Sequence, residues 1–485
     1  MKRVNLYLSI VFLCLCSCSQ FKQGDLPSSL PVEKSSDATD ATATDSTIDS
    51  SENSNLEDSA KSLADQISSL ETSKSDLKEE TSKSDLKEET SKSDLKEENS
   101  PPVKPEIDQQ EEVFEFIFEE KTSWVGKDLD SFSRQLAGLI PFKKKLSPET
   151  QNSFFQIINQ GWENLKNYVL DPMNIWKEEN KDVFDIKDSR IFYPFGGPDA
   201  LYVTQLFPQA QEYIILGLES GGSISTIQSN LPTEKGIKTF AKSMENFFKM
   251  GFFVTEYMIS QVSWASGVIP LFLAQLSKLG YNILEISEGT FEFKSNSAQQ
   301  SEDKKLKGVK AVRIKFKGKN DEEEKTITYI RCDSENKNLR RLKSLFSFIN
   351  EKPFFTFLKS SSYALHNSAF SKLREFILNN SSGVLQDDTG IPFRMIKKYS
   401  DYHLFGQYTQ PALKFFQKFY LQKDLALSYK NENVKKLPFR FGYGCSIVPS
   451  NLIFAKHLTK KAIISPFAVE SSDSLPSNPA EALEN

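Results

Sequence analysis

The sequence predicts one large α/β domain with a mixed, partly parallel sheet and an antiparallel insertion, after a long disordered N-terminal stalk. Strand-like apolar runs alternate with helix-like segments across residues 113–469, which is typical of a sheet with helices on both faces. Of the 57 aromatic residues, only Phe21 lies within residues 19–112. That stretch holds 24 acidic and 10 basic side chains, and such a composition buries too little apolar surface to fold.

The first residues have the pattern of an export signal. Lys2 and Arg3 precede a short apolar run that ends Leu15-Cys16-Ser17-Cys18. The run is too short for a stable membrane span but suits a signal-peptide core. Its ending resembles the bacterial lipoprotein lipobox, which implies that residues 1–17 are removed and that Cys18 carries the lipid anchor. An ordinary cleaved signal peptide is the alternative.

Residues 18–112 are predicted to be a lipid-anchored acidic stalk. The sequence Thr-Ser-Lys-Ser-Asp-Leu-Lys-Glu-Glu occurs three times in tandem over residues 72–98. A flexible chain of this length spans roughly 55 Å, so the stalk can hold the domain away from a membrane. A decoy or adhesive epitope is the rival interpretation. Ser19 follows the lipobox cysteine, and by the same resemblance this implies the outer membrane or the cell surface.

The folded part supplies strands and helices in alternation. Apolar or alternating runs bounded by Gly, Pro or polar residues predict strands over residues 190–195, 212–218, 281–286, 312–317, 326–332, 354–359 and 384–386. Apolar residues at helical spacing predict helices over 199–207, 234–250, 268–279, the segment capped by Asn338, and the segment that begins near Phe370. The antiparallel insertion falls near residues 290–332, and residues 470–485 form a polar disordered tail.

Residues 257–277 carry no charge and could be mistaken for a membrane span. They contain several Ser and Gln residues as well as Pro270, whereas a span needs about 20 predominantly apolar residues. Two buried helices that meet near Gly267 are therefore preferred.

The first candidate site follows two consecutive predicted strands. Gly196, Gly197 and Asp199 lie in the turn after residues 190–195, and Glu219 follows residues 212–218. In a Rossmann-like sheet such a turn offers backbone N–H groups to a phosphate, and the acid can bind a ribose hydroxyl. The layout resembles a nucleotide or S-adenosylmethionine site in outline, although Gly-Gly-Pro-Asp replaces the usual glycine pattern. The alternative is a tight turn with Asp199 in the first helical turn.

The second candidate site could be that of a hydrolase. Ser362 and His366 follow one predicted strand, and Asp387 and Asp388 follow the next. These residue types could act as nucleophile, base and orienting acid. No Gly-x-Ser-x-Gly motif surrounds Ser362, and a hydrogen-bonded loop is the alternative.

The remaining reactive residues predict little chemistry. His403 and His457 stand alone in the sequence, so neither a metal site nor a cofactor is expected. Cys332 and Cys445 could form a disulfide outside the cytosol, or both could be buried thiols. The excess of Lys and Arg in the folded part is expected to be spread along the chain, and no nucleic-acid partner is expected.

Residues 193–224 and 360–392 resemble a family of uncharacterised bacterial exported proteins and lipoproteins. The resemblance covers roughly residues 150–450 and implies a shared fold but no activity. We therefore predict a lipid-anchored cell-envelope protein that contacts the membrane through Cys18 and binds an envelope or extracellular protein partner. An exported hydrolase and a degenerate methyltransferase-like fold are the alternatives.

Overall fold

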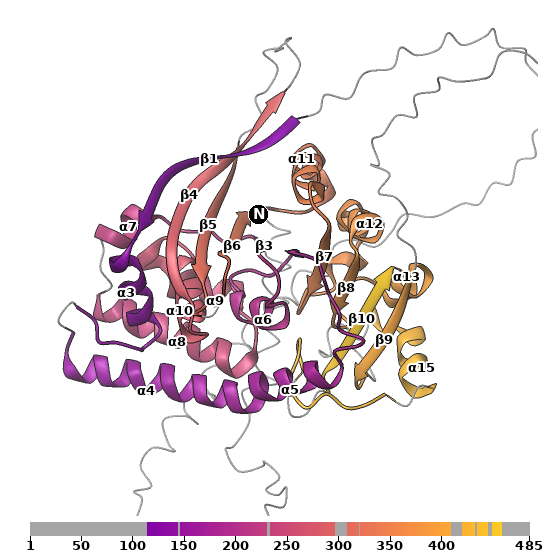
Figure 1. Cartoon of the computed structure of the whole chain (residues 1–485), viewed down its shortest axis with the longest axis horizontal. Coiled ribbons are helices and arrows are strands. Elements are labelled where there is room, and N and C mark those ends of the chain that lie inside the picture. Colours follow the sequence, from indigo (N-terminus) through magenta and orange to yellow (C-terminus); the bar gives the residue numbers. More distant parts are fainter. Residues whose placement is uncertain are drawn as a thin grey trace, which may run out of the picture. The chain divides into compact units, whose positions relative to one another are not determined.

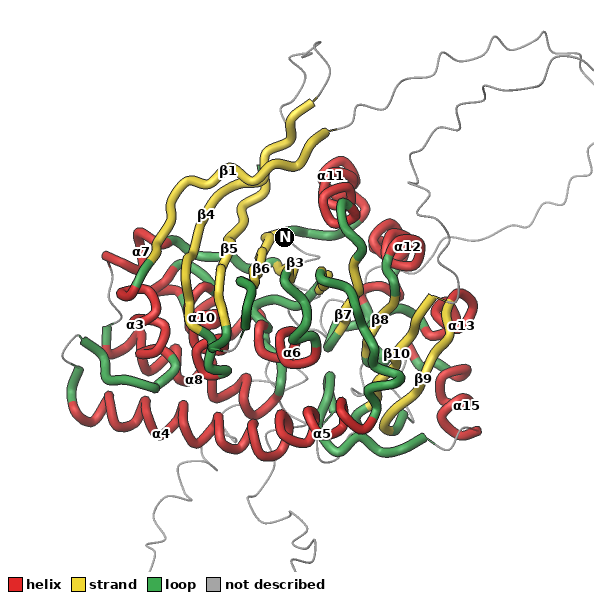
Figure 2. The backbone as a smooth tube through the Cα atoms, in the orientation of Figure 1, coloured by secondary structure: helices red, strands yellow, loops and turns green. Residues whose placement is uncertain are grey.

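The computed structural model describes residues 114–143, 146–229, 233–295, 308–319, 321–408, 420–431, 434–444 and 449–457. The lipobox with Cys18, the acidic repeats, Cys445 and the C-terminal tail lie outside these residues. Figure 1 shows the elements of the domain, and Figure 2 shows how they alternate along the chain.

One mixed sheet organises the domain. Its ten strands, among the described residues, lie in the order β1-β4-β5-β6-β3-β2-β7-β8-β10-β9. Their bounds are β1 (Phe114–Val125), β2 (Arg190–Tyr193), β3 (Glu212–Gly217), β4 (Asn282–Ser295), β5 (Val309–Lys317), β6 (Lys325–Arg331), β7 (Phe354–Leu358), β8 (Gly383–Gln386), β9 (Ser400–Gly406) and β10 (Asn451–His457).

The five central strands, β6-β3-β2-β7-β8, are all parallel. Both flanks are antiparallel: β1, β4 and β5 extend the sheet beyond β6, and β10 and β9 extend it beyond β8. The predicted α/β class, the partly parallel sheet and the antiparallel insertion are therefore confirmed. The pairing of β5 with β6 forms the predicted hairpin.

Helices cover both faces of the sheet (Figure 1). One face packs against α3 (Lys127–Leu136), α4 (Pro148–Leu165), the π-helical turn η2 (Lys166–Leu170), α5 (Asp171–Glu179), α6 (Ala200–Leu206), α7 (Ile224–Ser229), α8 (Glu234–Met250), α9 (Thr255–Gln261), the short η3 (Ser263–Ala265) and α10 (Ile269–Lys278). The other face packs against α11 (Leu339–Asn350), α12 (Ser371–Asn380), α13 (Phe393–Tyr399) and the short helices η5 (Ala364–His366) and η6 (Ser368–Phe370). η4 (Asn336–Asn338) precedes α11, and α15 (Lys423–Asn431) packs near β9.

Strand β2 shows why a run of apolar residues marks a central strand. Ile191 and Tyr193 face the core layer beneath α6 and α10, whereas Phe192 faces the opposite layer beneath α12. All of its residues are buried. A strand covered on both faces needs apolar side chains at every position, and this removes the alternation that an exposed strand would show.

Several helix ends follow the sequence signals. Thr233 accepts a hydrogen bond from the Gly236 amide at the start of α8, and Gly251 ends that helix in the left-handed region at φ 80°. These contacts satisfy backbone groups that a helix terminus would otherwise leave unpaired. Asn338 does precede α11, but its side chain makes no capping bond and instead donates to the Asp333 carbonyl. The predicted cap is therefore wrong, although the helix begins where expected.

The uncharged stretch at residues 257–277 forms α9, η3 and α10, which are separated by a turn at Ser266 and Gly267. Every residue of α10 from Ile269 to Ser277 is buried. None of the helices in the described residues is long and apolar enough to cross a bilayer. Of the two buried helices predicted here, α10 is buried as expected, but α9 is not, since its Ile259 is 53% exposed.

Candidate functional site

The carboxyl ends of the central strands form the edge at which an α/β sheet ordinarily binds ligands. The chain leaves β2 toward β3 on one side, and after β6 it crosses to β7 on the other side of β2. The loops after β2 and β7 therefore diverge, and the crevice that forms between such loops is the usual binding position. Asp199 follows β2, and Lys359 follows β7, so both residues lie at this switch point.

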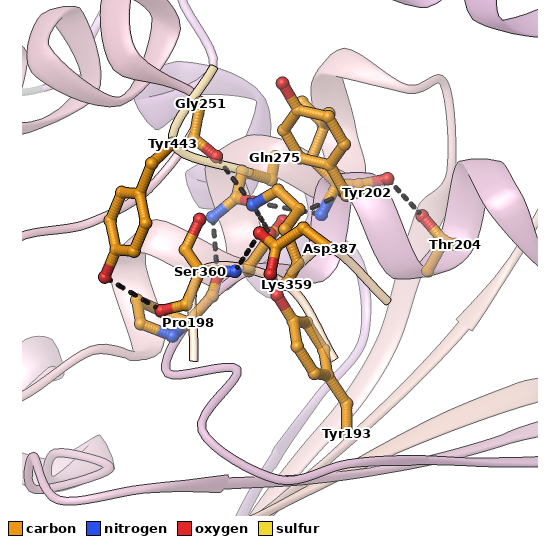
Figure 3. A network of polar contacts seen from close by, with 12 residues as sticks. Tyr193, Pro198, Tyr202, Thr204, Gly251, Gln275, Lys359, Ser360, Asp387 and Tyr443 are labelled. Carbon is orange, nitrogen blue, oxygen red and sulfur yellow. Dashed lines mark hydrogen bonds and ion pairs between the residues drawn. The ribbon is translucent and has the colours of Figure 1, made fainter. Parts of the chain in front are cut away.

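A buried ion pair fills the switch point. Lys359 Nζ lies 2.7 Å from Asp199 Oδ2, and the two side chains are 1% and 3% exposed. Lys359 also donates to the Gly251 carbonyl at 2.6 Å and lies 4.1 Å from the centre of the Tyr202 ring. The ammonium group thus has a carboxylate, a carbonyl and an aromatic face as partners. Figure 3 shows Lys359 with Gly251 and Tyr202. Such complete pairing offsets the desolvation of a buried charge.

Asp199 has two further structural roles. It is the N-cap of α6, because its Oδ1 accepts a hydrogen bond from the Tyr202 amide at 3.0 Å. Its Oδ2 also accepts from the Tyr193 hydroxyl at 3.2 Å. Burial, followed by the nearby Asp199 carboxylate, raises the pKa of Tyr193 well above its usual value. The hydroxyl therefore acts here as a hydrogen-bond donor and not as an acid.

The structure brings the first candidate set to one edge. Gly197 lies beside Glu219, because a Cβ placed on it would stand 4.0 Å from Glu219 Oε2. Gly197 has a φ of 54°, a conformation that favours glycine. A Cβ on Gly196 would stand 2.6 Å from the Tyr193 ring, so the turn packs too closely for any side chain there. The four residues Gly196, Gly197, Asp199 and Glu219 are thus neighbours, as their positions after β2 and β3 predict.

The donors and acceptors that a nucleotide would need are already used within the protein. The Gly197 amide donates to the Leu216 carbonyl at 3.2 Å. The Leu201 amide donates to Gln275 Oε1 at 3.0 Å. Glu219, which is buried, accepts from Thr255 Oγ1 at 2.6 Å and from the Tyr329 hydroxyl at 3.3 Å. Because these groups face one another, the turn and the acid do not fit a nucleotide or S-adenosylmethionine in this conformation.

Residues 439–444, which we call the strap, cover the loops at the carboxyl ends of the central strands. Tyr443 donates to the Ser360 carbonyl at 3.0 Å and packs edge-on against Phe252. A Cβ on Gly442 would stand 2.0 Å from Asp387 Oδ2, so only glycine can cover this carboxylate so closely. Phe441 contacts the Tyr202 and Phe357 rings. The strap therefore seals the side of the switch point that faces away from the sheet.

Asp387 and Asp388, from the second candidate set, are buried and bonded to different partners. Asp387 accepts from the amides of Ser360 and Thr389, each at 2.9 Å. Asp388 accepts from Asn451 Nδ2 at 2.8 Å and from the Tyr363 hydroxyl. Burial, with the Asp387 carboxylate as the second cause, raises the pKa of Asp388 to about 7. Burial also raises the pKa of Asp387, so this pair holds a proton more readily than ordinary aspartates.

Ser362 and His366 are not joined in the described contacts. The Ser362 hydroxyl lies 2.7 Å from the Tyr443 hydroxyl, whereas the His366 ring packs against Tyr363 and Tyr420. In the described residues Nε2 of His366 is buried without a hydrogen-bond partner. Burial, together with nearby arginines, lowers the pKa of His366 to about 3. The relay that a hydrolase of this kind needs is not formed among the described side chains, and a histidine with so low a pKa is a weak base.

Backbone strain gathers at this edge. Of the five non-glycine residues with positive φ in the described chain, four lie here: Phe195, Ser360, Ser362 and Tyr363, with φ between 51° and 65°. Left-handed residues of this kind cost about 1–3 kcal/mol each and are common at functional sites. The left-handed pair Ser362 and Tyr363 begins the 3₁₀ turn η5. The hydroxyl of Ser362 meets Tyr443 at the start of this turn, and the His366 ring lies at its end.

Other candidate residues lie elsewhere. His403 is exposed on β9, and His457 ends β10. Cys332 is partly buried after β6, while its predicted partner Cys445 is outside the described residues, so the disulfide stays a prediction. In the described part, no three His, Cys, Asp or Glu side chains are grouped to hold a metal. A cavity of about 10 Å³ lies between α8 and α9, away from the strand ends, and holds at most about one water.

Three residues of this site were not predicted from the sequence: Lys359, Tyr443 and Gly442. Lys359 is the first charged residue after an apolar strand, and its partner Asp199 lies 160 residues earlier. A charge directly after a strand that ends at the binding edge was the available signal. No protein-family model matches the chain, and no curated protein matches it either.

Proposed function

We propose that this protein is a lipid-anchored cell-envelope protein whose α/β domain acts by binding a partner and not by catalysis. In this proposal Cys18 holds the chain to the membrane, the acidic stalk spaces the domain from it, and the domain has a degenerate methyltransferase-like fold. The ligand crevice of that fold is closed by the protein's own side chains.

The order of the strands supports the methyltransferase-like assignment. Without the inserted strands β4 and β5, the seven strands from β6 to β9 run 3-2-1-4-5-7-6 when β2 is counted as the first. The last strand in the chain, β10, is antiparallel to both of its neighbours. The order 3-2-1-4-5 is that of a doubly wound Rossmann-like sheet, in which a cofactor lies at the carboxyl ends of the strands, and the antiparallel last strand is the feature on which we base the methyltransferase-like assignment.

The observation that carries the proposal of a closed crevice is the Lys359–Asp199 pair at the switch point. A ligand in the crevice would have to displace an ion pair that is almost fully buried and a strap whose Tyr443 is bonded to the loop after β7. Separating a buried pair costs several kcal/mol. The Ser362 and His366 contacts likewise give the hydrolase alternative no support.

Thermal unfolding of the purified full chain tests this proposal. Samples contain S-adenosylmethionine, S-adenosylhomocysteine, a dinucleotide or no addition, and a methyltransferase of known affinity is measured in parallel. A ligand present at 100 times its Kd stabilises a folded protein by about 2.7 kcal/mol, which is readily seen as a rise in Tm. We expect no rise. A concentration-dependent rise with any of these ligands would contradict the closed crevice.

A further inference from the structure

Residues 393–440 form one of two strongly basic stretches in the folded part. They contain ten Lys and Arg against three Asp and Glu, a net of +7. Residues 304–319 are also basic, with eight Lys and Arg and no Asp or Glu, but they lie in and beside β5 and are followed by the four acidic residues 321–324.

The two helices of this stretch, α13 and α15, lie at the β9 end of the sheet (Figure 1), whereas Arg440 donates to the Lys249 carbonyl at the end of α8. Both helices turn apolar residues inward, into a cluster built from Phe393, Leu404, Tyr408, Leu425 and Ile453. Their basic side chains are consequently left on the outside. We call six exposed residues the basic face: Arg394 and Lys397 on α13, Lys423 and Lys430 on α15, and Lys435 and Lys436 in the loop after α15.

The members of the basic face are not paired with acids. Within the described residues none of the six forms an ion pair, whereas several exposed lysines on other elements do: Lys242 pairs with Glu245, Lys337 with Asp333, and Lys372 with Glu375. Unpaired charges of one sign that lie near one another add to a strong local potential. Such a surface attracts an anionic partner.

Two exposed leucines lie among these charges. Leu427 on α15 is 57% exposed, and Leu421 just before this helix is 45% exposed. Leu427 is four residues after Lys423 and three before Lys430, so the three side chains share one face of the helix. Leucines flanked by lysines are typical of helices that rest at a membrane interface, where apolar side chains insert and the cations meet lipid headgroups.

We propose that the basic face, with Leu421 and Leu427, docks onto the surface of an anionic phospholipid bilayer. Each Lys or Arg near such a surface contributes about 1 kcal/mol, or about fivefold in affinity. A soluble polyanion would satisfy the charges but leave the leucines in water. The acidic residues 19–112 of the same chain match the charge as well, but they are poor in apolar residues and would leave the leucines uncovered. The choice of a bilayer rests on the proposed membrane anchor.

Vesicle binding tests the docking surface without relying on acylation. The full chain is purified unacylated as a Cys18→Ser variant, and its sedimentation with vesicles is measured with phosphatidylcholine alone and with phosphatidylcholine mixed with phosphatidylglycerol. The test variant carries Lys423→Glu, Lys430→Glu, Lys435→Glu and Lys436→Glu. A control with the same change in net charge carries Lys121→Glu, Lys127→Glu, Lys235→Glu and Lys238→Glu, at exposed lysines on other elements.

We expect the parent and the control to bind the mixed vesicles and the test variant to bind at least about 100-fold more weakly. Added salt should weaken binding, because it screens exposed charges. Equal losses in the test and control variants would overturn the proposal, as would no preference of the parent for anionic vesicles. The latter result is also what coverage of the basic face by residues 19–112 would give.

A Leu421→Asn, Leu427→Asn variant separates a bilayer from a soluble polyanion such as heparin. The bilayer proposal predicts weaker vesicle binding with heparin binding unchanged. If vesicle binding is unchanged as well, the face binds polyanions and the bilayer proposal fails. Because all samples are unacylated, these results are independent of whether Cys18 carries lipid in cells.

Discussion

Two groups of charges in this domain are held in opposite ways. At the carboxyl ends of β2 and β7, Lys359 and Asp199 are buried and every charged atom has a partner inside the protein. On the basic face, Lys423, Lys430 and their neighbours are exposed and form no ion pair within the described residues. The first group stabilises the folded state, because removing either partner would leave the other charge buried without solvation. The second group contributes little to stability and is available to another molecule.

This difference leads to the largest predicted effect, a loss of stability in Lys359→Met. The substitution leaves the Asp199 carboxylate buried without its cation, and we expect the free energy of unfolding to fall by about 3–5 kcal/mol. Adding Asp199→Asn, which keeps an oxygen to cap α6, should recover most of the loss. Denaturant titration measures both variants. The matched control is Lys372→Met, in an exposed pair with Glu375, which should lose less than about 1 kcal/mol. A comparable loss of unfolding free energy in Lys359→Met and Lys372→Met would contradict the assignment of Lys359 and Asp199 as a buried, stabilising pair.

The buried pair beside this network should give a dependence of stability on pH. Asp388 titrates near 7 in the folded protein and near 3.8 when unfolded. Between these values the folded state keeps a proton that the unfolded state has released, so its contribution to stability falls as the pH rises. Asp388→Asn removes this contribution. The stability of the variant relative to the parent should therefore increase from pH 4 to 7, by at most about 1.4 kcal/mol per pH unit.

His366 should show the opposite trend. Its pKa is about 3 when folded and 6.5 when unfolded, so the unfolded state binds the extra proton between these values and stability rises with pH. His366→Phe keeps an aromatic ring against Tyr363 and removes the titration. The variant should gain stability relative to the parent as the pH falls from 6.5 toward 3. If the stability of the parent and of His366→Phe depends on pH in the same way, the His366 ring is solvated in the folded protein.

A smaller loss is expected from Tyr443→Phe. The phenyl ring can still pack against Phe252, but the hydrogen bonds to Ser362 and to the Ser360 carbonyl are lost. A net loss of about 1 kcal/mol is expected, measured by thermal unfolding. Tyr168→Phe, at an exposed tyrosine, serves as the control and should be neutral. No loss in Tyr443→Phe would mean that the strap is held by its other contacts.

The smallest effect on stability is expected at the basic face. Each of the four Lys→Glu substitutions designed for the vesicle experiment should change the free energy of unfolding by no more than about 0.5 kcal/mol. Thermal unfolding of each single variant measures this. Losses comparable to that of Lys359→Met would show that these lysines are structural, and would remove the contrast between the two groups.

Much of the central sheet could be predicted because each of its strands has a recognisable local sequence pattern. The apolar runs that became β2, β3, β7 and β8 lie between Gly, Pro or polar residues, and burial on both faces accounts for their composition. The order of these strands could not be predicted, since pairings such as β2 with β7 join residues more than 160 positions apart. β1 was not assigned, although Phe and Glu alternate at its start. β9 and β10 were not assigned either, because their short runs are equally compatible with a loop.

The candidate site was predicted in its location but not in its chemistry. Placing Gly197, Asp199 and Glu219 after consecutive strands brought them to one edge, as topology requires. Their partners came from distant parts of the chain: Lys359 for Asp199, and Thr255 and Tyr329 for Glu219. Ser362 and His366 were grouped only because they are close in the sequence. In the structure the turn between them begins with two left-handed residues, and the two side chains have different partners: Ser362 contacts Tyr443, and His366 packs against Tyr420.

The proposed place of this protein in the cell envelope depends on lipid attachment at Cys18, and metabolic labelling is a direct test of that attachment. Cells that express the full chain or its Cys18→Ala variant are grown with labelled palmitate, and the purified proteins are examined by mass spectrometry. We expect label on the parent chain, loss of residues 1–17 and no label on the variant. An unlabelled parent chain that retains its initiator methionine would contradict lipid attachment at Cys18.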